Sequence, residues 1–367
     1  MSANRRVWYA THVVSLAPLS TTAYTTTHGV QSVGVNTNFT LLNIMELGQS
    51  NLYELKEMIP EIDVTMDKVL DGYPLLFHLA TQGAGDPSLV GRSNQQSQFC
   101  MNVYSDVQQS ASGTPTSEIV CSGMYFQSSS FTFPVDAPFR ESMTLVGNTK
   151  TYNSSGFVYT PTYTNADAPL ALAGSGGTQI RNDMIFYPIG NSSPASENSN
   201  TLDSNGQVAA FLTILPPEIG VSSSGTNDLV NGDFLAKIQN ITVSCNVGRD
   251  SVLELGRKYP YFRFAQFPIP VNTEISVIAL NTDTQNATEA GYNGQGDNLY
   301  NRSIRIRARD GTFIDLGLQN KLTSINWAGG DTGGGQATIT YSFITYQNYT
   351  VTHPADPSWS SAWPYIS

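Results

Sequence analysis

Few residues in this sequence have the types and spacing that catalysis or metal binding requires. The four histidines form no HxH or HExxH pattern, and the three cysteines match no zinc-binding spacing. The sequence has no GxSxG motif that would expose a nucleophilic serine, and its glycine-rich stretches lack the lysine of a phosphate-binding loop. We therefore expect no catalytic residue, no metal site and no cofactor, and we do not expect an enzyme.

Acidic side chains gather on the polar side of two predicted strands. Asp63 and Asp67 share one face of a strand predicted from residue 61 to 69, because successive side chains of a strand point to opposite sides. Glu274 lies on the polar side of a second such strand. Carboxylates placed in this way could serve acid–base chemistry or hold a cation, but surface strands often carry such pairs. We therefore expect an open sheet face that is acidic to polar.

Three arginines form the sharpest charge pattern in the sequence. Arg305, Arg307 and Arg309 alternate with apolar residues, so their guanidinium groups should line one face of a strand. A solvated face is the simplest interpretation of this basic stripe. Ion pairing with an acidic patch of a neighbouring subunit is the second, since guanidinium groups suit interfaces, and direct contact with DNA is the third.

The composition favours strands and argues against tight binding of nucleic acid. The net charge is −11 at pH 7 although only 13% of the residues are charged. Most of the polar surface must therefore be Ser, Thr, Asn and Gln, which together with frequent aromatic and β-branched residues favour strands and turns over helices. An acidic chain with few basic clusters should not grip nucleic-acid phosphates.

The cysteines and the apolar runs indicate where the chain is made. Cys100, Cys121 and Cys245 are an odd number, and we expect them to be buried free thiols in a protein made in a reducing cytoplasm. No signal peptide opens the chain, and apolar runs such as residues 73–80 are too short to span a bilayer. We therefore expect no membrane partner.

One stretch of the sequence occurs twice. The segment from residue 30 aligns with the segment from residue 238 and continues without a gap to Pro60, which meets Pro268. This alignment predicts two versions of one unit, and two copies are too few for a solenoid. Its eight identical pairs are Gln31/Gln239, Val35/Val243, Asn38/Asn246, Glu46/Glu254, Leu47/Leu255, Gly48/Gly256, Tyr53/Tyr261 and Pro60/Pro268.

Each version of the unit predicts a strand, an exposed excursion and a second strand. Residues 30–39 and 61–69 alternate apolar and polar side chains, so each should bury one side. Between them, apolar residues from 41 to 47 predict a short helical turn that ends at Gly48. After the excursion the two versions alternate out of phase by one residue, which predicts a slip after Pro60, at a bulge.

The two excursions carry many large apolar side chains. Such segments rarely stay in water, because large exposed apolar patches usually mark contacts with partners. We therefore predict that both excursions contact neighbouring subunits. The residues concerned are Leu47, Tyr53, Leu55, Met58, Tyr259, Tyr261, Phe262 and Phe264.

The chain divides into two units of similar length. Each unit is expected to hold about six antiparallel strands in a β-sandwich or partial barrel. In the first unit, residues 15–27 are predicted as a loop and residues 75–80 as a short helix, whose counterpart is lost in the second. The predicted divisions are a first unit with an N-terminal arm over 1–150, a linker over 151–181, a second unit with insertions over 182–350 and a C-terminal tail over 351–367.

Four segments carry a resemblance to a known family. They are GVQSVGVNTNF from residue 29, ELGQSNLYE from residue 46, IPEIDVTMDKVLDGYPLLFHLATQ from residue 59 and LELGRKYPYFRFAQFPIPVNTEISV from residue 253. These segments resemble tail tube proteins of tailed bacteriophages, in a version with two tube domains fused in one chain. The resemblance covers roughly residues 5–150 and 182–350, and it rests on patterned segments without a catalytic signature.

The resemblance implies a mainly β fold and a structural role. It implies two tandem tail-tube-like domains, each a β-sandwich or partial barrel with a short helix and a long loop that reaches into the adjoining ring. Six such domains close a ring in that family, so three copies of this chain would complete one, and stacked rings would form the hollow tail tube of a virion. Asp63, Asp67 and Glu274 would then be candidates for the lining of the channel.

The same resemblance implies the partners of the chain. They are further copies of itself, other phage tail proteins, and double-stranded DNA that passes through the lumen during genome ejection without sequence-specific binding. An acidic or neutral wall suits such passage, because a basic wall would hold the duplex. Two alternatives remain open. One is another phage structural component, such as a neck, tail terminator or decoration protein, and the other is a surface adhesin or pilus-type module.

Overall fold

The structure, a computed structural model, describes most of the chain. The described residues are 7, 9–19, 21–84, 88–105, 114–159, 177–184, 213, 215–216, 219, 237–279, 301, 303–329, 337–346 and 348–356. They form antiparallel strands with two short α-helices, so the predicted mainly β fold is confirmed. The second unit's insertions, which its Asn-, Ser- and Gly-rich composition predicts at residues 191–205 and 222–227, lie outside the described residues. Most of the C-terminal tail lies outside them as well.

The first unit contains ten strands and both described α-helices. The strands are β1 His12–Pro18, β2 Thr25–Thr26, β3 Val30–Asn38, β4 Leu41–Met45, β5 Leu52–Glu57, β6 Glu61–Val69, β7 Gln96–Val103, β8 Ser117–Pro134, β9 Arg140–Gly147 and β10 Thr149–Asn153. The helices are α1 Leu76–Ala80 and α2 Leu89–Ser93. A short 3-10 turn, Tyr9–Thr11, precedes β1.

The second unit follows the same order of elements. Its strands are β11 Lys237–Asn246, β12 Arg249–Val252, β13 Phe262–Ala265, β14 Pro270–Ile278, β15 Arg305–Arg307, β16 Phe313–Asp315, β17 Lys321–Ala328, β18 Thr338–Tyr346 and β19 Thr350–Thr352. A 3-10 turn, Arg181–Asp183, lies upstream of them. The residues that would correspond to α1 lie outside the described part of the chain.

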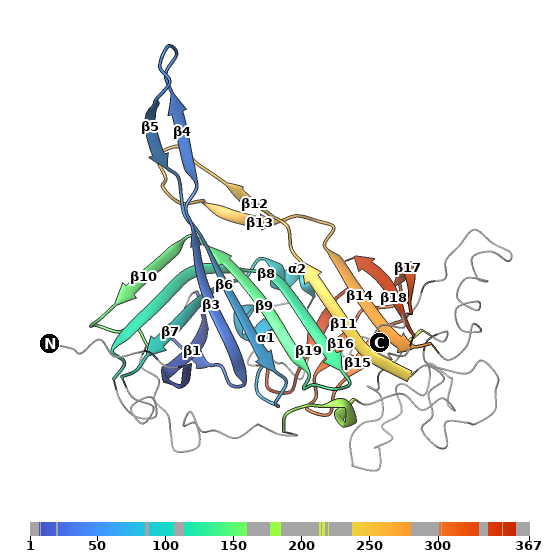
Figure 1. Cartoon of the computed structure of the whole chain (residues 1–367). Helices are drawn as coiled ribbons and strands as arrows, with labels where there is room; N and C mark the ends of the chain where they lie inside the picture. Colours follow the sequence, from blue (N-terminus) through green and yellow to red (C-terminus); the bar gives the residue numbers. More distant parts are fainter. Residues whose placement is uncertain are drawn as a thin grey trace, which may run out of the picture.

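One sheet runs through both units (Figure 1). Its strands pair in the order β3-β6-β9-β8-β11-β14-β18-β17, and all neighbours are antiparallel. We call these eight strands the long sheet. The two units join at its centre, where β8 pairs with β11 and Phe131 lies opposite Val243. The long sheet therefore ends in β3 on one side and in β17 on the other.

A second layer covers one face of the long sheet. The N-terminal half of β8 leaves the long sheet and pairs with β7 and β10, and β1 and β2 extend that layer. In the second unit β15, β16 and β19 form the corresponding three-stranded sheet. One cluster of buried apolar side chains fills the space between the layers and includes residues of both units. The expected boundaries at residues 150 and 350 fall inside β10 and β19, so neither divides the core.

The two units have the same strand register. A bulge skips Gln31 where β3 meets β6, and an identical bulge skips Gln239 where β11 meets β14. A second matched pair of bulges skips Gln127 between β8 and β9 and Thr323 between β17 and β18. The one-residue slip expected after Pro60 is present, because the partner of each β11 residue lies one position later than the repeat spacing predicts.

Three local predictions were wrong. The predicted helical turn is instead strand β4, Leu41–Met45, because Gly48 at φ +91° turns the chain back into a hairpin, and most of its apolar side chains stay exposed. Residues 15–27 contain most of β1 together with β2, and Leu16 is fully buried. Finally, β8 is one strand of 18 residues that serves both layers, whereas the sequence pattern predicts two strands, over residues 118–126 and 130–133.

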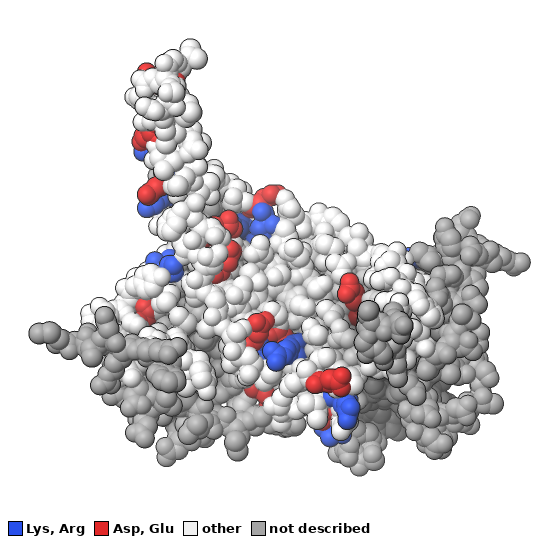
Figure 2. Space-filling view, in the orientation of Figure 1, with Lys and Arg blue, Asp and Glu red and all other residues white. Residues whose placement is uncertain are grey.

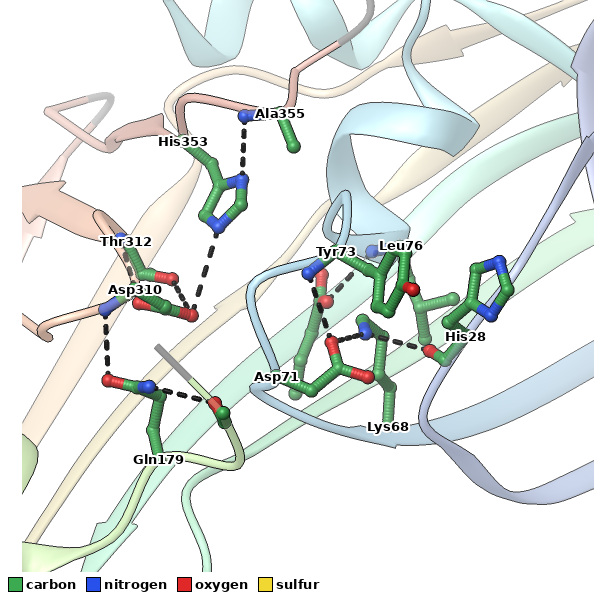
Figure 3. Close-up of polar contacts among 12 residues, drawn as sticks. His28, Lys68, Asp71, Tyr73, Leu76, Gln179, Asp310, Thr312, His353 and Ala355 are labelled. Carbon is green, nitrogen blue, oxygen red and sulfur yellow. Dashed lines mark hydrogen bonds and ion pairs between the residues drawn. The ribbon is translucent and has the colours of Figure 1, made fainter. Parts of the chain in front are cut away.

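Buried polar groups hold α1 beneath the long sheet (Figure 3). The carboxylate of Glu141 accepts hydrogen bonds from the backbone N–H groups of Leu76 at 2.8 Å and Phe77 at 2.7 Å. Beside it, the buried Lys68 ammonium pairs with Asp71 and donates to the carbonyl oxygen of His28 at 2.7 Å. The Glu141 carboxylate thus replaces the intrahelical partners that the first turn of a helix lacks.

Candidate assembly surfaces

Two β-hairpins leave the same end of the long sheet (Figure 1). Hairpin 1 consists of β4 and β5, residues 41–57, and hairpin 2 consists of β12 and β13, residues 249–265. Both turn at a glycine in the left-handed region, Gly48 at φ +91° and Gly256 at φ +85°. The side chains of Leu47 and Leu255, just before these glycines, are completely exposed. Each hairpin therefore presents the same Glu-Leu-Gly tip to solvent.

The apolar residues predicted to contact partners lie on these hairpins or at their bases. Most have side chains that are between 42% and 103% exposed, namely Leu47, Tyr53, Leu55, Met58, Tyr259, Tyr261 and Phe264. Phe262 is the exception, because its ring packs edge-on against Tyr125 with centroids 5.5 Å apart. Exposed apolar surface concentrated on two projections is typical of a protein that binds partners through them.

Hairpin 2 lies against the first unit of its own chain. The guanidinium of Arg249 donates to the carbonyl oxygen of Phe126 at 2.9 Å and lies 5.0 Å from the centre of the Tyr125 ring. Burial lowers the pKa of Arg249 to about 10. Arg263 donates to Asn148 Oδ1 at 3.0 Å. Hairpin 1 makes no corresponding contact among the described residues, and all six residues of β5 are exposed.

The uncovered face of the long sheet is polar and carries few charges. On most of its strands, alternate residues are buried under the second layer while the intervening ones face outward. The outward residues are mainly Ser, Thr and Asn, and Figure 2 shows that charged atoms on the visible side of the molecule are scattered. The predicted acidic residues Asp63, Asp67 and Glu274 alternate with buried ones on β6 and β14, so all three lie on this face.

Two of these carboxylates are held by neighbours on β3. The Ser32 hydroxyl donates to Asp67 at 2.6 Å, and the Asn38 side-chain amide donates to Asp63 at 3.1 Å. Partial burial, and then the nearby charge of Glu61, raise the pKa of Asp63. Among the described residues, no group of three or more potential metal ligands is close enough to hold an ion.

The two edges of the long sheet are counterparts of its two central strands. Strand β3 corresponds in the repeat to β11, and β17 corresponds to the C-terminal half of β8. Ile241 and Val243 of β11 are buried, whereas Val33 and Val35 at the matching positions of β3 are half-buried. Trp327 of β17 is 45% exposed, whereas its counterpart Phe131 is fully buried. Each edge therefore exposes the apolar side chains that the central junction covers.

The predicted arginine stripe has partners in its own chain. Arg305 pairs with Asp315 at 3.3 Å, and Arg309 pairs with Asp183 at 3.5 Å. The backbone N–H of Arg307 donates to the hydroxyl of Thr213 at 2.9 Å. The carboxylates that face two of these guanidinium groups thus lie within the chain, and pairing with a neighbouring subunit stays a prediction.

The remaining ionisable groups of interest are buried and structural in position. His78 Nε2 lies 2.9 Å from the carbonyl oxygen of Val351, and burial lowers its pKa to about 3. Arg92 pairs with Asp356 at 2.9 Å, which ties the C-terminal segment to α2. The three cysteines are free and buried, as expected. No helix in the described part of the chain is long and apolar enough to cross a membrane.

Sequence reasoning missed the sheet edges and the anchor of hairpin 2. The valines of β3 predict a strand with one buried face, but alternation does not show how many neighbouring strands pair with it. Arg249 gave no signal, since a single arginine at the start of an excursion reads as a surface residue. Comparison of the two versions at this position, Leu41 against Arg249, was the signal available.

Comparison with known proteins gave only distant similarities. A scan of protein-family models and a search of curated proteins found no match. The chain is similar to the tube-terminating cap of the anti-feeding prophage, at 11% identity and TM-score 0.32, and to the sheath–tube complex of the PVC extracellular contractile injection system, at 10% and 0.31. Each covers 42% of this chain and 95% of the other.

A third similar structure is the tail of an empty gene transfer agent particle. It matches at 16% identity and TM-score 0.23, and the match covers 34% of this chain and 91% of that one.

Proposed function

We propose that this chain is a structural protein of a phage tail, in which copies close into rings that stack as a hollow tube. One observation carries the proposal: the long sheet ends in two edges that reproduce the two sides of its own central junction. If β17 of one copy pairs with β3 of the next as β8 pairs with β11, every junction in the ring becomes equivalent. Closure also removes both exposed edges, which otherwise invite uncontrolled pairing.

The proposed edge pairing buries complementary side chains. The central junction places Phe131 opposite Val243 and Ser130 opposite Ser244. The same register between copies places Trp327 opposite Val35 and, on the outer face, Asn326 opposite Asn36. Burial of an aromatic ring against a β-branched side chain across two strands is among the stabilising pairs of antiparallel sheets. The half-exposed core side of each edge supports this pairing.

The number of copies follows from the resemblance, which calls for six domains and hence three chains. Three long sheets of eight strands would form a closed barrel. With strands spaced about 4.8 Å apart and tilted by about 40°, such a barrel is roughly 45 to 50 Å across between backbones. That leaves a channel wider than a DNA duplex after side chains are counted.

The proposed channel wall is the polar face that holds Asp63, Asp67 and Glu274. Duplex DNA carries about one negative charge per 1.7 Å, so basic side chains on the wall would bind it and neutral or acidic ones would let it slide. Hydroxyl and amide side chains dominate this face. Double-stranded DNA is therefore proposed to pass without sequence-specific contacts, and the other partners are neighbouring tail proteins of the same virion.

Hairpins 1 and 2 are the proposed contacts between rings. Both project from the same end of the sheet, and both end in an exposed leucine. A ring of three chains would carry six such tips around one rim, each able to enter the ring above. Directional projections of this kind generate a stack, because the contact joins two different surfaces of the same protein.

Electron microscopy of the purified protein tests the proposal. We expect hollow tubes or stacks of rings that show six similar projections around each ring. Isolated rings alone would favour a neck or terminator role, and glycan binding by a monomer would favour a surface adhesin or pilus-type module. A protein that stays monomeric at high concentration, with no ring in any condition, would contradict the proposed function.

A further inference from the structure

The contacts of hairpin 2 inside one chain are a template for contacts of hairpin 1 with another chain. Hairpin 2 lies on the first unit, where the C-terminal half of β8 begins and where β9 ends. The counterparts of these places in the second unit are the ends of β17 and β18. Hairpin 1 and β17 stand at opposite sides of the long sheet (Figure 1), so a single copy does not bring them together.

The first template contact joins two aromatic rings. Phe262 of hairpin 2 packs edge-on against Tyr125 of β8 at 5.5 Å. In the repeat, Glu54 occupies the position of Phe262, because both pair with matching residues across their hairpins. Lys321 occupies the position of Tyr125, since each pairs with the matching residue of the adjacent strand. An aromatic pair is thus replaced by two side chains of opposite charge.

The second template contact is polar and is replaced by an apolar pair. Arg263 of hairpin 2 donates to Asn148, which follows β9, at 3.0 Å. Leu55 of hairpin 1 occupies the position of Arg263, and Tyr346 at the end of β18 occupies the position of Asn148. Leu55 is 49% exposed and Tyr346 is 53% exposed, so each leaves an apolar surface uncovered.

At a third position an arginine of hairpin 2 is replaced by a leucine of hairpin 1. Arg249 of hairpin 2 bonds the carbonyl oxygen of Phe126. Leu41 occupies the position of Arg249, and Leu322 occupies that of Phe126. Leu41 is 47% exposed. At two sites, therefore, both partners differ from the template and yet remain matched in charge or in polarity, and at the third the arginine that bonds a backbone carbonyl is replaced by an exposed leucine.

We propose that hairpin 1 docks on the β17–β18 end of a second copy of this chain, with Glu54 facing Lys321 and Leu55 facing Tyr346. This inference rests on the proposed ring. It names the surface that hairpin 1 contacts, which the pairing of β3 with β17 alone does not specify. Within its own chain the Glu54 carboxylate lies 3.8 Å from the exposed Lys56 ammonium. Such a solvent-exposed pair is weak, so release of the Glu54 carboxylate from Lys56 costs little.

Charge reversal tests the proposed contact between copies. In full-length protein, Glu54→Lys and Lys321→Glu should each weaken ring association by about tenfold or more, because each places like charges together. The double variant should restore association to within about threefold of the parent, since the pair is re-formed with its polarity reversed. Asp136→Lys is the matched control, because it makes the same charge change at an exposed position in the turn between β8 and β9, outside the proposed contact, and should leave ring association unchanged.

Sedimentation and native mass spectrometry separate the two possible failures. If the parent protein forms no rings, the proposed function fails and this contact fails with it. If the parent forms rings and both single variants associate as the parent does, or the double variant is no better than the singles, only the contact is overturned. Circular dichroism of each variant shows that it is folded.

A cysteine pair provides a second measurement that does not depend on charge. In the parent background, Leu55→Cys combined with Tyr346→Cys should yield disulfide-linked copies on oxidation, whereas each single substitution should yield none at comparable times. The native cysteines are buried and should not contribute. Rings that form normally but never cross-link through this pair would also overturn the contact.

Discussion

At the scale of residues, the first unit buries two ionisable side chains next to α1. Lys68 and Glu141 are fully buried there, and burial raises the pKa of Glu141 to about 7 in spite of two backbone hydrogen bonds. The matching strand positions of the second unit hold Val277 and Ile339, both buried. Buried charges persist only where partners satisfy them. Here the first turn of α1 supplies the partners of Glu141, and Asp71 pairs with Lys68.

His78 makes a prediction about pH and stability. Burial lowers its pKa from 6.5 to about 3, so between these values the unfolded chain binds a proton that the folded chain excludes. The free energy of unfolding should therefore fall as the pH is lowered from about 6.5 toward 3, by up to about 1.4 kcal/mol per pH unit from this residue. Urea denaturation between pH 7 and pH 4 measures this dependence.

The matched variant for this measurement is His78→Gln, which cannot take up the proton. Its stability should fall less steeply over the same range, while carboxylates elsewhere contribute equally to both proteins. Parallel pH profiles for the two proteins would show that His78 does not exclude the proton. NMR titration of the imidazole checks the protonation state directly, and a midpoint near 6.5 would contradict the assignment.

At this scale the sequence predicted which side chains are buried and which face outward, but not which side chains contact each other. The burial of the cysteines and the outward placement of Asp63, Asp67 and Glu274 could be predicted from residue types and alternation. The carboxylates that pair with Arg305 and Arg309 could not. Asp183 is far from Arg309 in sequence, and only the folded chain brings the two to 3.5 Å.

At the scale of elements, the two hairpins have matched geometry and different surroundings. Their tips share the sequence Glu-Leu-Gly and the same turn. The strands on either side of the tips differ, because charged, aromatic and aliphatic residues occupy different positions in the two hairpins. The helix prediction for residues 41–47 was wrong because a short run of apolar residues without alternation fits a helix and a strand equally well. The identical glycines Gly48 and Gly256 were the better guide, since both adopt positive φ.

The hairpin tips predict the step from rings to tubes. The double variant Leu47→Asp with Leu255→Asp should form rings that do not stack, because each exposed leucine would otherwise gain about 1.5 to 3 kcal/mol on burial in the next ring. Negative-stain microscopy should show single rings where the parent shows tubes. If the double variant forms tubes of normal length, the hairpin tips do not form the contact between rings.

At the scale of the whole molecule, the two units share one sheet and one core. The repeat in the sequence predicted matching units, but it predicted them as neighbours joined by a linker over 151–181. The structure joins them through β8 and β11, two strands more than a hundred residues apart in the chain. A local pattern could not reveal this junction, because each strand reads as half-buried whether or not another strand pairs with its edge.

The central claim is that β3 of one copy pairs with β17 of the next in the register of β11 with β8. The most direct measurement is oxidative cross-linking of full-length protein that carries Asn36→Cys and Asn326→Cys. These positions correspond to Ser244 and Ser130, which lie directly opposite each other at the central junction. Opposed residues of antiparallel strands have Cβ atoms about 4.5 to 5.5 Å apart, close enough for a disulfide after small adjustments.

The control pair is Ser32→Cys with Ser324→Cys, which the same register separates by six residues, about 20 Å along the strand. After oxidation and denaturation, the account predicts a covalent product of three times 39.7 kDa for the first pair and uncross-linked chains for the control. Equal cross-linking of both pairs, or chains of 39.7 kDa alone from the first pair in protein that has assembled, would contradict the proposed edge pairing.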